Sequence, residues 1–458
     1  MFAAPTRLRA MPDTSGADAY REVERRMLAR WPESRLDPTL ERIAGLCDLL
    51  GSPQRAYPVV HLTGTNGKTS TARMVDALLL ALGLRTGRFT SPHVQEMTER
   101  ITLHGVPISH ERFVEVYDEV IPYAEIIDRS GPNPVSFFEL VTAMGFAAFA
   151  DAPVDAAVVE VGMGGSWDAT NVADGSVAVV SPIDVDHASY LGNTPEDIAV
   201  EKAGIIKAGA IAVLAEQTVP VAEVLLERAA EVGATVVREG VEFGVEERTP
   251  GLGGQLITLQ GVAGRYDEVF LPLYGAHQAQ NAACALAAVE AFAGGNGLDA
   301  DLVREGYASV TSPGRLEVVR RSPVVVVDAA HNPHGAAATA AAIEEAFSFS
   351  SLVGVVGVMA DKDVAGLLEA FEPVMTSIIC TRNSTPRALP AESLAAVARD
   401  IFGDERVDVV ARLDDALELA MARADIDATQ PLGLGGAGVL VTGSVITAGE
   451  ARLLLGGR

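Results

Sequence analysis

The sequence predicts an α/β protein with two domains. The N-terminal domain is expected to have a mainly parallel sheet, and the smaller C-terminal domain is expected to be doubly wound and Rossmann-like. The 458 residues are too many for one ordinary core. Hydrophobic residues make up 48% and charged residues 21%, which is a globular composition. Short apolar runs alternate with helical patterns along most of the chain, as parallel sheets with helical crossovers require.

A strand–loop–helix unit comes first. Tyr57–Leu62 has the pattern of a buried strand, Thr63–Gly67 that of a turn, and Lys68–Leu82 that of a helix ending at Gly83. Leu256–Gln260 and Glu268–Leu273 are expected to pair with each other as a small antiparallel element. Further strands of the N-terminal sheet are predicted at Ala156–Val161, Val177–Ile183 and Ile211–Leu214.

The C-terminal domain is predicted from a second series of apolar runs that begins near Pro313. An alanine-rich helix is expected at Gly335–Phe347. Thr311–Pro323, with two prolines, one glycine and three arginines, is the candidate hinge, so the domains are placed at residues 1–314 and 315–458. The strand candidates are Val324–Val327, Leu352–Val358, Ser377–Thr381, Val407–Val410 and Val439–Thr442.

The charge balance narrows the classes of partner. With 61 acidic and 35 basic residues the net charge is −26, so non-specific binding to nucleic acid or to an anionic membrane is not expected. No apolar run is long enough to span a bilayer. Residues 1–16 lack the apolar core of a secretory signal and are expected to form a loose arm. The three widely spaced cysteines Cys47, Cys284 and Cys380 indicate free thiols in a reducing cytoplasm.

The segment HLTGTNGKTS (residues 61–70) almost matches a phosphate-binding P-loop, and it lies between a strand and a helix. The usual pattern needs a glycine where this chain has Leu62; the glycine stands at Gly64 instead. Gly64 and Gly67 allow close approach of the backbone to phosphate, and the helix that follows directs free N–H groups at the anion. Lys68 is expected to reach the outer phosphates, and the hydroxyl of Thr69 is the usual metal ligand. The alternative is an ordinary glycine-rich turn.

Polar groups follow several other strands of the same sheet. Ser91, in the loop that also carries His93, Glu99 and Arg100, Glu160 at the end of an apolar strand, and His187 in Asp184-Val-Asp-His187 are candidate magnesium ligands. Taken singly, Ser91 fits a turn, Glu160 an ion pair and His187 a helix cap. Ligands bind at the carboxyl ends of such strands, and this favours one shared site.

Two lysines and three residues near later elements lie outside these loops. Lys207 is interpreted as a solvated helix lysine, whereas the role of Lys202 stays open. Asn281 begins the predicted helix Asn281–Phe292 and either caps it or contacts a base. Asp328 and His331 follow the strand Val324–Val327, in DAAHNPHG.

These stretches, in this order, resemble the folylpolyglutamate synthase/dihydrofolate synthase family, a branch of the Mur-type amide ligases. The matching pieces are GTNGKT, TSPH…ERI, VEVGMGG-WDATN, DVDH, EKAGI-K, HQAQN, SPGR, DAAHNPHG and TGS. They cover about residues 57 to 445. One departure is Ser166, where many relatives have arginine. The resemblance implies ATP- and magnesium-dependent amide formation between a dihydropteroate or reduced-folate carboxylate and L-glutamate.

The resemblance also implies site residues. Lys68, Lys202 and His331 would be catalytic, and Lys202 matches a lysine that is often carbamylated in the superfamily. Ser91, Glu160 and His187 would bind magnesium. The ATP site would comprise Thr65, Asn66, Gly67, Lys68, Thr69, Asn281, Arg315 and Asp328. The folate or pteroate site would comprise Arg100, Ser136, Phe137, Phe138, Glu139, Trp167, Asp168 and Ala169. His331 and the loop Thr381–Arg387, with Ser384 and Arg387, would lie on the glutamate side.

The ATP- and folate-binding domain would then be 1–314 and the glutamate-ligase domain 315–458, acting as a monomer with small-molecule substrates. Ser136–Glu139 and Trp167–Ala169 favour a bifunctional enzyme.

Three other classes of protein are alternatives. A peptidoglycan-precursor ligase would share the phosphate loop but not TSPH…ERI or DAAHNPHG. A P-loop switch or motor would show N-K-x-D or a basic nucleic-acid track. A binding module would not need acidic and imidazole groups at successive strand ends.

Overall fold

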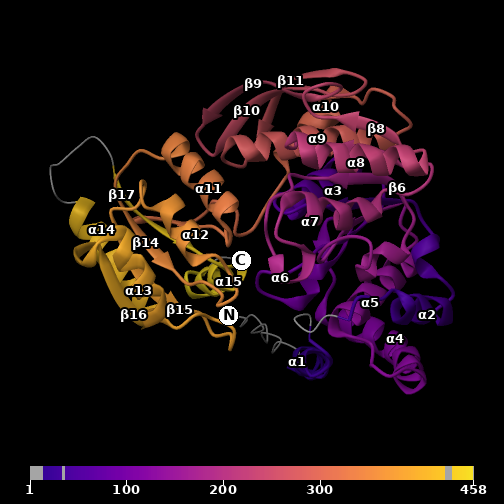
Figure 1. The fold of residues 1–458 in the computed structure, drawn as a ribbon, viewed down its shortest axis with the longest axis horizontal. Coiled ribbons are helices and arrows are strands. Elements are labelled where there is room, and N and C mark those ends of the chain that lie inside the picture. The colour runs from indigo at the N-terminus through magenta and orange to yellow at the C-terminus, as the bar shows by residue number, and fades with distance from the viewer. Residues whose placement is uncertain (1–13, 33–36, 429–435, 457–458) are drawn as a thin grey trace, which may run out of the picture.

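The computed structural model describes residues 14–32, 37–428 and 436–456, and within them the chain forms two α/β domains that lie side by side (Figure 1). Residues up to Val310 form three of the buried apolar clusters. Residues from Leu316 onward form two others. The two-domain prediction is therefore confirmed, and we propose residues 314 and 315 as the boundary.

The N-terminal domain is built on an eight-stranded sheet. Its strands are β1 (Val59–Thr63), β2 (Thr86–Phe89), β3 (Ile101–Leu103), β4 (Val106–Pro107), β5 (Ala156–Glu160), β6 (Gly175–Val180), β7 (Ile211–Leu214) and β8 (Thr235–Arg238). Their order is β4-β3-β2-β5-β1-β6-β7-β8, and only the pairs β2–β3 and β3–β4 within it are antiparallel. The mainly parallel sheet is confirmed.

Helices cover both faces of this sheet. They are α1 (Thr14–Leu28), α2 (Glu41–Leu49), α3 (Lys68–Ala81), α4 (His110–Ser130), α5 (Phe137–Asp151), α6 (Ala188–Leu191), α7 (Pro195–Lys202), α8 (Val219–Val232), α9 (Ala276–Phe292) and α10 (Ala300–Ala308). Neighbouring residues of a strand point to opposite faces, so Val59 packs with α1, α2, α4 and α5 and Val60 with α3, α9 and α10.

The N-terminal arm expected at residues 1–16 is only partly described. Residues 1–13 lie outside the described part of the chain, and Thr14 already begins α1. Among the described residues, none of the helices has the length and hydrophobicity that a membrane span needs.

A three-stranded antiparallel sheet is added to the N-terminal domain. It contains β9 (Gly244–Gly251), β10 (Gly254–Gln260) and β11 (Arg265–Leu271), with β10 in the middle. The β10–β11 pair was predicted, whereas β9 was not. Figure 1 shows this sheet at the top of the view, where β9 extends toward the other domain.

The C-terminal domain is doubly wound, as predicted. Its strands are β12 (Glu317–Arg321), β13 (Val324–Val327), β14 (Phe349–Val356), β15 (Ser377–Arg382), β16 (Val407–Arg412) and β17 (Gly436–Thr442). Its helices are α11 (Pro333–Ala346), α12 (Val364–Phe371), α13 (Ala391–Phe402), α14 (Leu413–Ala428) and α15 (Val445–Leu454). The first three helices pack on one face of the sheet and the last two on the other.

The strand order is β12-β13-β17-β14-β15-β16, and β12 alone among these strands is antiparallel to its neighbour. The predicted hinge Thr311–Pro323 was therefore too long. Glu317–Arg321 pairs with β13 as an edge strand, and this leaves residues 311–316 as the connection between the two domains.

Candidate active site at the domain boundary

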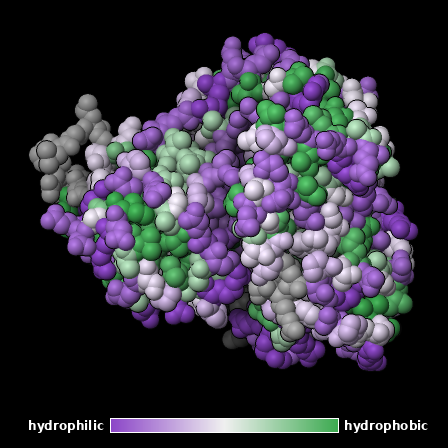
Figure 2. Space-filling model, viewed as in Figure 1, coloured by the Kyte–Doolittle hydropathy of each residue, from purple (hydrophilic) through white to green (hydrophobic). Residues whose placement is uncertain are grey.

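A cavity of about 620 Å³ lies between the domains and is lined by both. Loops after β1, β5 and β6 and the start of α9 line one side, and the loop after β13 and the start of α11 line the other. Hydrophilic residues run along this boundary in Figure 2. These loops follow the carboxyl ends of parallel strands, where ligands of such sheets bind.

The loop after β1 requires glycine at two positions. Gly64 has φ 141°, and a Cβ there would lie 1.9 Å from Ser181 Oγ. Gly67 has φ 88°, and its Cβ would lie 2.4 Å from Asn281 Oδ1. Thr65 holds this loop against the loop after β6, since Thr65 Oγ1 donates a hydrogen bond to the Asp184 carbonyl at 2.8 Å. The backbone can thus approach a phosphate closely, with the N-terminus of α3 behind it.

Two lysines converge on this loop. Lys68 Nζ donates to the carbonyls of Gly64 at 2.9 Å and Thr65 at 3.1 Å. Lys202 Nζ donates to the same Gly64 carbonyl at 2.8 Å, and its side chain is buried. Burial and the nearby charge of Lys68 hold the pKa of Lys202 well below its usual range. Lys202 is therefore not a solvated helix lysine.

Glu160, the last residue of β5, connects the first turn of α3 to the loop after β2. Its Oε1 accepts a hydrogen bond from Thr69 Oγ1 at 2.7 Å and its Oε2 accepts one from the Ser91 N–H at 3.2 Å. Burial raises the pKa of Glu160, and the charge of Lys68 opposes that shift. His187 lies in the N-cap position of α6 with φ 53°, and burial lowers its pKa to about 4.

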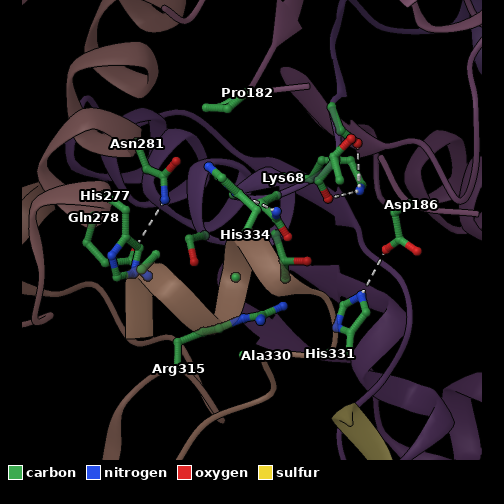
Figure 3. A pocket seen from close by; sticks show the side chains of 18 of the residues that line it. Lys68, Pro182, Asp186, His277, Gln278, Asn281, Arg315, Ala330, His331 and His334 are labelled. Atoms are coloured by element: carbon green, nitrogen blue, oxygen red, sulfur yellow. Dashed lines mark hydrogen bonds and ion pairs between the residues drawn. The ribbon is translucent and has the colours of Figure 1, made fainter. Parts of the chain in front are cut away.

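Asp186 joins the two domains. Its carboxylate accepts hydrogen bonds from Lys362 Nζ at 2.5 Å and Asn332 Nδ2 at 3.2 Å, and lies 3.4 Å from His331 Nε2. Burial raises the pKa of Asp186, but His331 and the charges of His187 and Lys362 hold it well below its usual range. Figure 3 shows the Asp186–His331 contact at one end of the cavity.

Several of these residues were not identified from the sequence. Asp186 and Asn332 lie inside the motifs DVDH and DAAHNPHG, which by themselves assign them no role, and Lys362 lies outside every motif. A basic residue just after the predicted strand Leu352–Val358 was the available signal for Lys362. Asn66 completes the contact between the domains, because its side-chain amide lies 2.9 Å from His334 Nδ1 and 3.3 Å from Asn332 Oδ1.

The remaining predicted ATP residues also lie on the cavity wall. The helix α9 begins at Ala276, so Asn281 lies within the helix and the cap interpretation is wrong. Asn281 Nδ2 donates to Gln278 Oε1 at 3.2 Å, and Arg315 points into the cavity (Figure 3). Asp328 accepts from the N–H groups of Leu316 and Ala330 and thereby fixes the turn that carries Arg315.

The predicted folate residues do not line this cavity but lie behind one of its loops. A Cβ on Gly162 would lie 2.4 Å from the ring of Phe138, and the Met163 N–H donates to Asp168 Oδ2 at 2.9 Å. Both Gly162 and Met163 line the cavity. Trp167 and Ala169 flank Asp168 on the same loop.

The four other predicted folate residues have structural contacts. Ser136 and Glu139 form a capping box at the start of α5. Glu139 also accepts hydrogen bonds from Arg42 at 3.1 Å. The guanidinium of Arg100 lies 5.0 Å from the ring centre of Phe137.

A buried relay positions Asp168. Thr170 Oγ1 donates to Asp168 Oδ1 at 2.5 Å and lies 2.9 Å from His61 Nε2, which belongs to β1. Burial raises the pKa of Asp168 to about 6 and lowers that of His61 to about 3, so His61 is neutral. Because the Thr170 hydroxyl gives its one proton to Asp168, His61 Nε2 is the donor in the second hydrogen bond. The relay joins the strand before the phosphate loop to the predicted folate loop.

The predicted glutamate residues Ser384 and Arg387 lie outside the cavity. Ser384 donates to Glu450 Oε1 at 2.5 Å, and Arg387 donates to Asp361 Oδ1 at 3.2 Å. Only His331 of that group lines the cavity.

Comparison with known proteins identifies the chain. Residues 62–289 match the Mur ligase middle domain and residues 314–445 match the Mur ligase glutamate ligase domain. Together with a phosphate loop that faces a second domain, these matches define an ATP-dependent amide ligase of the Mur type. The chain belongs to the folylpolyglutamate synthase/dihydrofolate synthase family within that class.

Three comparisons support this assignment. The Mycobacterium tuberculosis dihydrofolate synthase/folylpolyglutamate synthase is 51% identical over 455 residues, 95% of this chain and 93% of the relative. The structure of Mycobacterium tuberculosis folylpolyglutamate synthase complexed with ADP superposes with a TM-score of 0.94 at 51% identity, covering 96% of this chain and 99% of that one. Escherichia coli FolC in complex with DHPP and ADP gives 0.81 at 29% identity, covering 97% and 99%.

Proposed function

We propose that this ligase uses ATP to join the amino group of L-glutamate to a carboxylate of a reduced folate and of dihydropteroate. The observation that carries the proposal is one cavity lined by the phosphate loop on one side and by Arg315, His331 and Asp328 on the other. A triphosphate on the first side and an amino acid on the second would meet within it. ADP and DHPP complexes of relatives support these substrate classes.

The chemistry assigns the phosphate loop its role. A carboxylate is a poor electrophile, so its oxygen first attacks the γ-phosphorus of ATP, which forms an acyl phosphate and releases ADP. The glutamate nitrogen then attacks the acyl carbon, and the C–O bond to phosphate breaks with loss of a proton from nitrogen. Lys68 and the N-terminus of α3 stabilise the charge that gathers on the transferred group.

Glu160, Ser91 and His187 are the residues that we propose for magnesium. Among the described residues, no group of three or more His, Cys, Asp or Glu side chains is arranged so that it could hold a metal ion by itself. Mg²⁺ does not need one, because it keeps several waters and is commonly held by one or two carboxylates and substrate phosphates. The buried carboxylate of Glu160, between Thr69 and Ser91, fits that donor set. The ion would supply charge neutralisation between the phosphate groups when bound.

We further propose that the folate or pteroate ring binds near Phe137, Phe138 and Asp168, beside the loop that contains Gly162 and Met163. The protein is proposed to act as a monomer in the cytoplasm. Cys47, Cys284 and Cys380 support the reducing compartment, since each is a buried free thiol.

A turnover assay tests the proposed substrates. Purified protein with ATP, magnesium and L-glutamate is expected to add one glutamyl residue to dihydropteroate and, in a parallel reaction, to a reduced folate. Product mass and ADP release are measured, with omission of L-glutamate as the control. Activity on the folate alone would restrict the enzyme to polyglutamylation. ADP release that does not depend on L-glutamate with either acceptor would contradict the proposal.

A further inference from the structure

The two domains meet a second time, at a distance along the chain from the phosphate loop. Arg248 of β9 forms a bidentate ion pair with Glu345 of α11: Nη1 lies 2.6 Å from Oε2, and Nη2 pairs with Oε1. The side chains are 21% and 30% exposed. Both residues line the cavity together with His277 of α9. The pair therefore connects the small antiparallel sheet to the C-terminal domain across the nucleotide cavity.

A buried glutamine connects this ion pair to the start of α9. Gln255 Oε1 accepts a hydrogen bond from Arg248 Nη1 at 3.3 Å. Its Nε2 donates to the carbonyls of Leu273 at 2.9 Å and Gly275 at 3.0 Å, just before the first residue of α9. Gln255 is 1% exposed. Gln255 thus orients Arg248 and also holds the backbone that leads into α9.

Apolar contacts lie beside the ion pair. The rings of Tyr274 and Phe347 are 5.0 Å apart between centroids, and Tyr274 packs against the C-terminal core although it belongs to the N-terminal domain. Gly275 has φ 92°, and a Cβ there would lie 2.8 Å from Ala342 Cβ of α11. The backbone before α9 therefore approaches α11 closely, and glycine is needed for this approach.

We propose that Arg248, Gln255, Tyr274, Glu345 and Phe347 form an interdomain clasp that positions α11 on α9. The proposal rests on the cavity being the nucleotide site. The helix α9 carries Asn281, which touches the phosphate loop at Gly67, and α11 begins directly after His331 and Asn332. By fixing one helix on the other, the clasp sets the position of the His331 loop relative to the phosphate loop. Its members are positioning residues, not catalytic ones.

The strength of the clasp comes from its geometry. Ion pairs between exposed side chains contribute little, because water screens them and ordering long side chains costs entropy. This pair is bidentate, only partly exposed and held by Gln255, which is the arrangement in which charge-assisted hydrogen bonds are strongest. It also joins two domains that the chain connects through the short segment 311–316, so the pair acts on domain orientation.

Charge reversal tests the clasp. Arg248→Glu and Glu345→Arg are each expected to raise the dissociation constant for ADP and the KM for ATP by about three- to tenfold, while the KM for L-glutamate changes less than about twofold. The double variant restores the pair but not the hydrogen bond to Gln255 Oε1, so it is expected to bring both nucleotide constants back only part of the way toward the wild-type values. Arg265→Glu is the matched control, because Arg265 pairs with Glu246 inside the small sheet and does not cross the boundary.

Two binding results would overturn the clasp. One is wild-type ADP affinity in both single variants, and the other is a double variant that binds ADP no better than the worse single variant.

Small-angle X-ray scattering of the nucleotide-free protein separates this inference from the proposed function. The single variants are expected to have a larger radius of gyration than the wild type, and equal radii would refute the clasp even if the wild type bound no ADP. Failure of the wild type to bind ADP, with larger radii in the variants, would contradict the proposed function and leave the clasp supported.

Discussion

Replacement of Lys68 by alanine is expected to lower kcat/KM for ligation by about 10²–10³-fold or more. Lys68 Nζ lies beside the carbonyls of Gly64 and Thr65, on the wall of the cavity. During phosphoryl transfer, negative charge from the triphosphate and from the attacking carboxylate gathers at this loop. An enclosed cation stabilises that charge more than an exposed one, since little water screens it.

The measurement is steady-state turnover with saturating L-glutamate, together with the melting temperature. Lys68 is on the cavity wall and its two carbonyl partners can be solvated from the cavity, so the variant is expected to keep the fold. Arg55→Ala is the matched control, because it removes one positive charge from an exposed position outside the cavity. Near-normal turnover by Lys68→Ala would remove the phosphate-loop assignment.

Removal of carbon dioxide from the buffer is expected to lower the ligase activity about tenfold or more, and added bicarbonate is expected to restore that activity. We propose that Lys202 carries a carbamate. Burial and the charge of Lys68 hold the pKa of Lys202 well below its usual range, so a larger fraction of its amine is neutral near pH 8. The neutral nitrogen attacks the carbon of CO₂ and releases a proton, which converts a buried neutral amine into an anion suited to metal binding.

Activity is measured in CO₂-free buffer with and without bicarbonate, and carbon-13 NMR with labelled bicarbonate detects the carbamate. Lys202→Arg is expected to be inactive under both conditions and to lack the signal. Lys207→Arg is the control, because Lys207 lies outside the cavity and its Nζ donates to the carbonyls of Asn171 and Ala173, so its interpretation as a solvated helix lysine is wrong. Equal activity in both buffers, with no carbamate signal, would exclude the modification.

The fold was predictable where hydrophobicity alone decides it. Ile211–Leu214 and Val324–Val327 coincide with β7 and β13, because each is a short apolar run of strand length. The strand β9 was missed because Gly244–Gly251 is charged and mostly exposed, so no apolar pattern marks it. The start of α9 was placed too late because Gln278 and Asn281 are polar yet buried by their position on the cavity wall.

The candidate site was predictable where one motif contains the geometry. Gly64, Gly67 and Lys68 lie within a few residues of one another, so their local conformation places them together. Contacts such as Asp186–Lys362 join residues 176 positions apart, and they depend on how the two domains pack. No periodicity or local spacing in the chain encodes that packing.

Transfer of oxygen between the substrates tests the central claim, amide formation through an acyl phosphate, most directly. The acceptor, dihydropteroate or folate, is labelled with oxygen-18 in its reacting carboxylate, and the phosphate released in the presence of ATP and L-glutamate is analysed by mass spectrometry. Because the carboxylate oxygen becomes bonded to phosphorus before the C–O bond breaks, each phosphate is predicted to carry one labelled oxygen. Unlabelled phosphate accompanied by normal amide product would contradict the account.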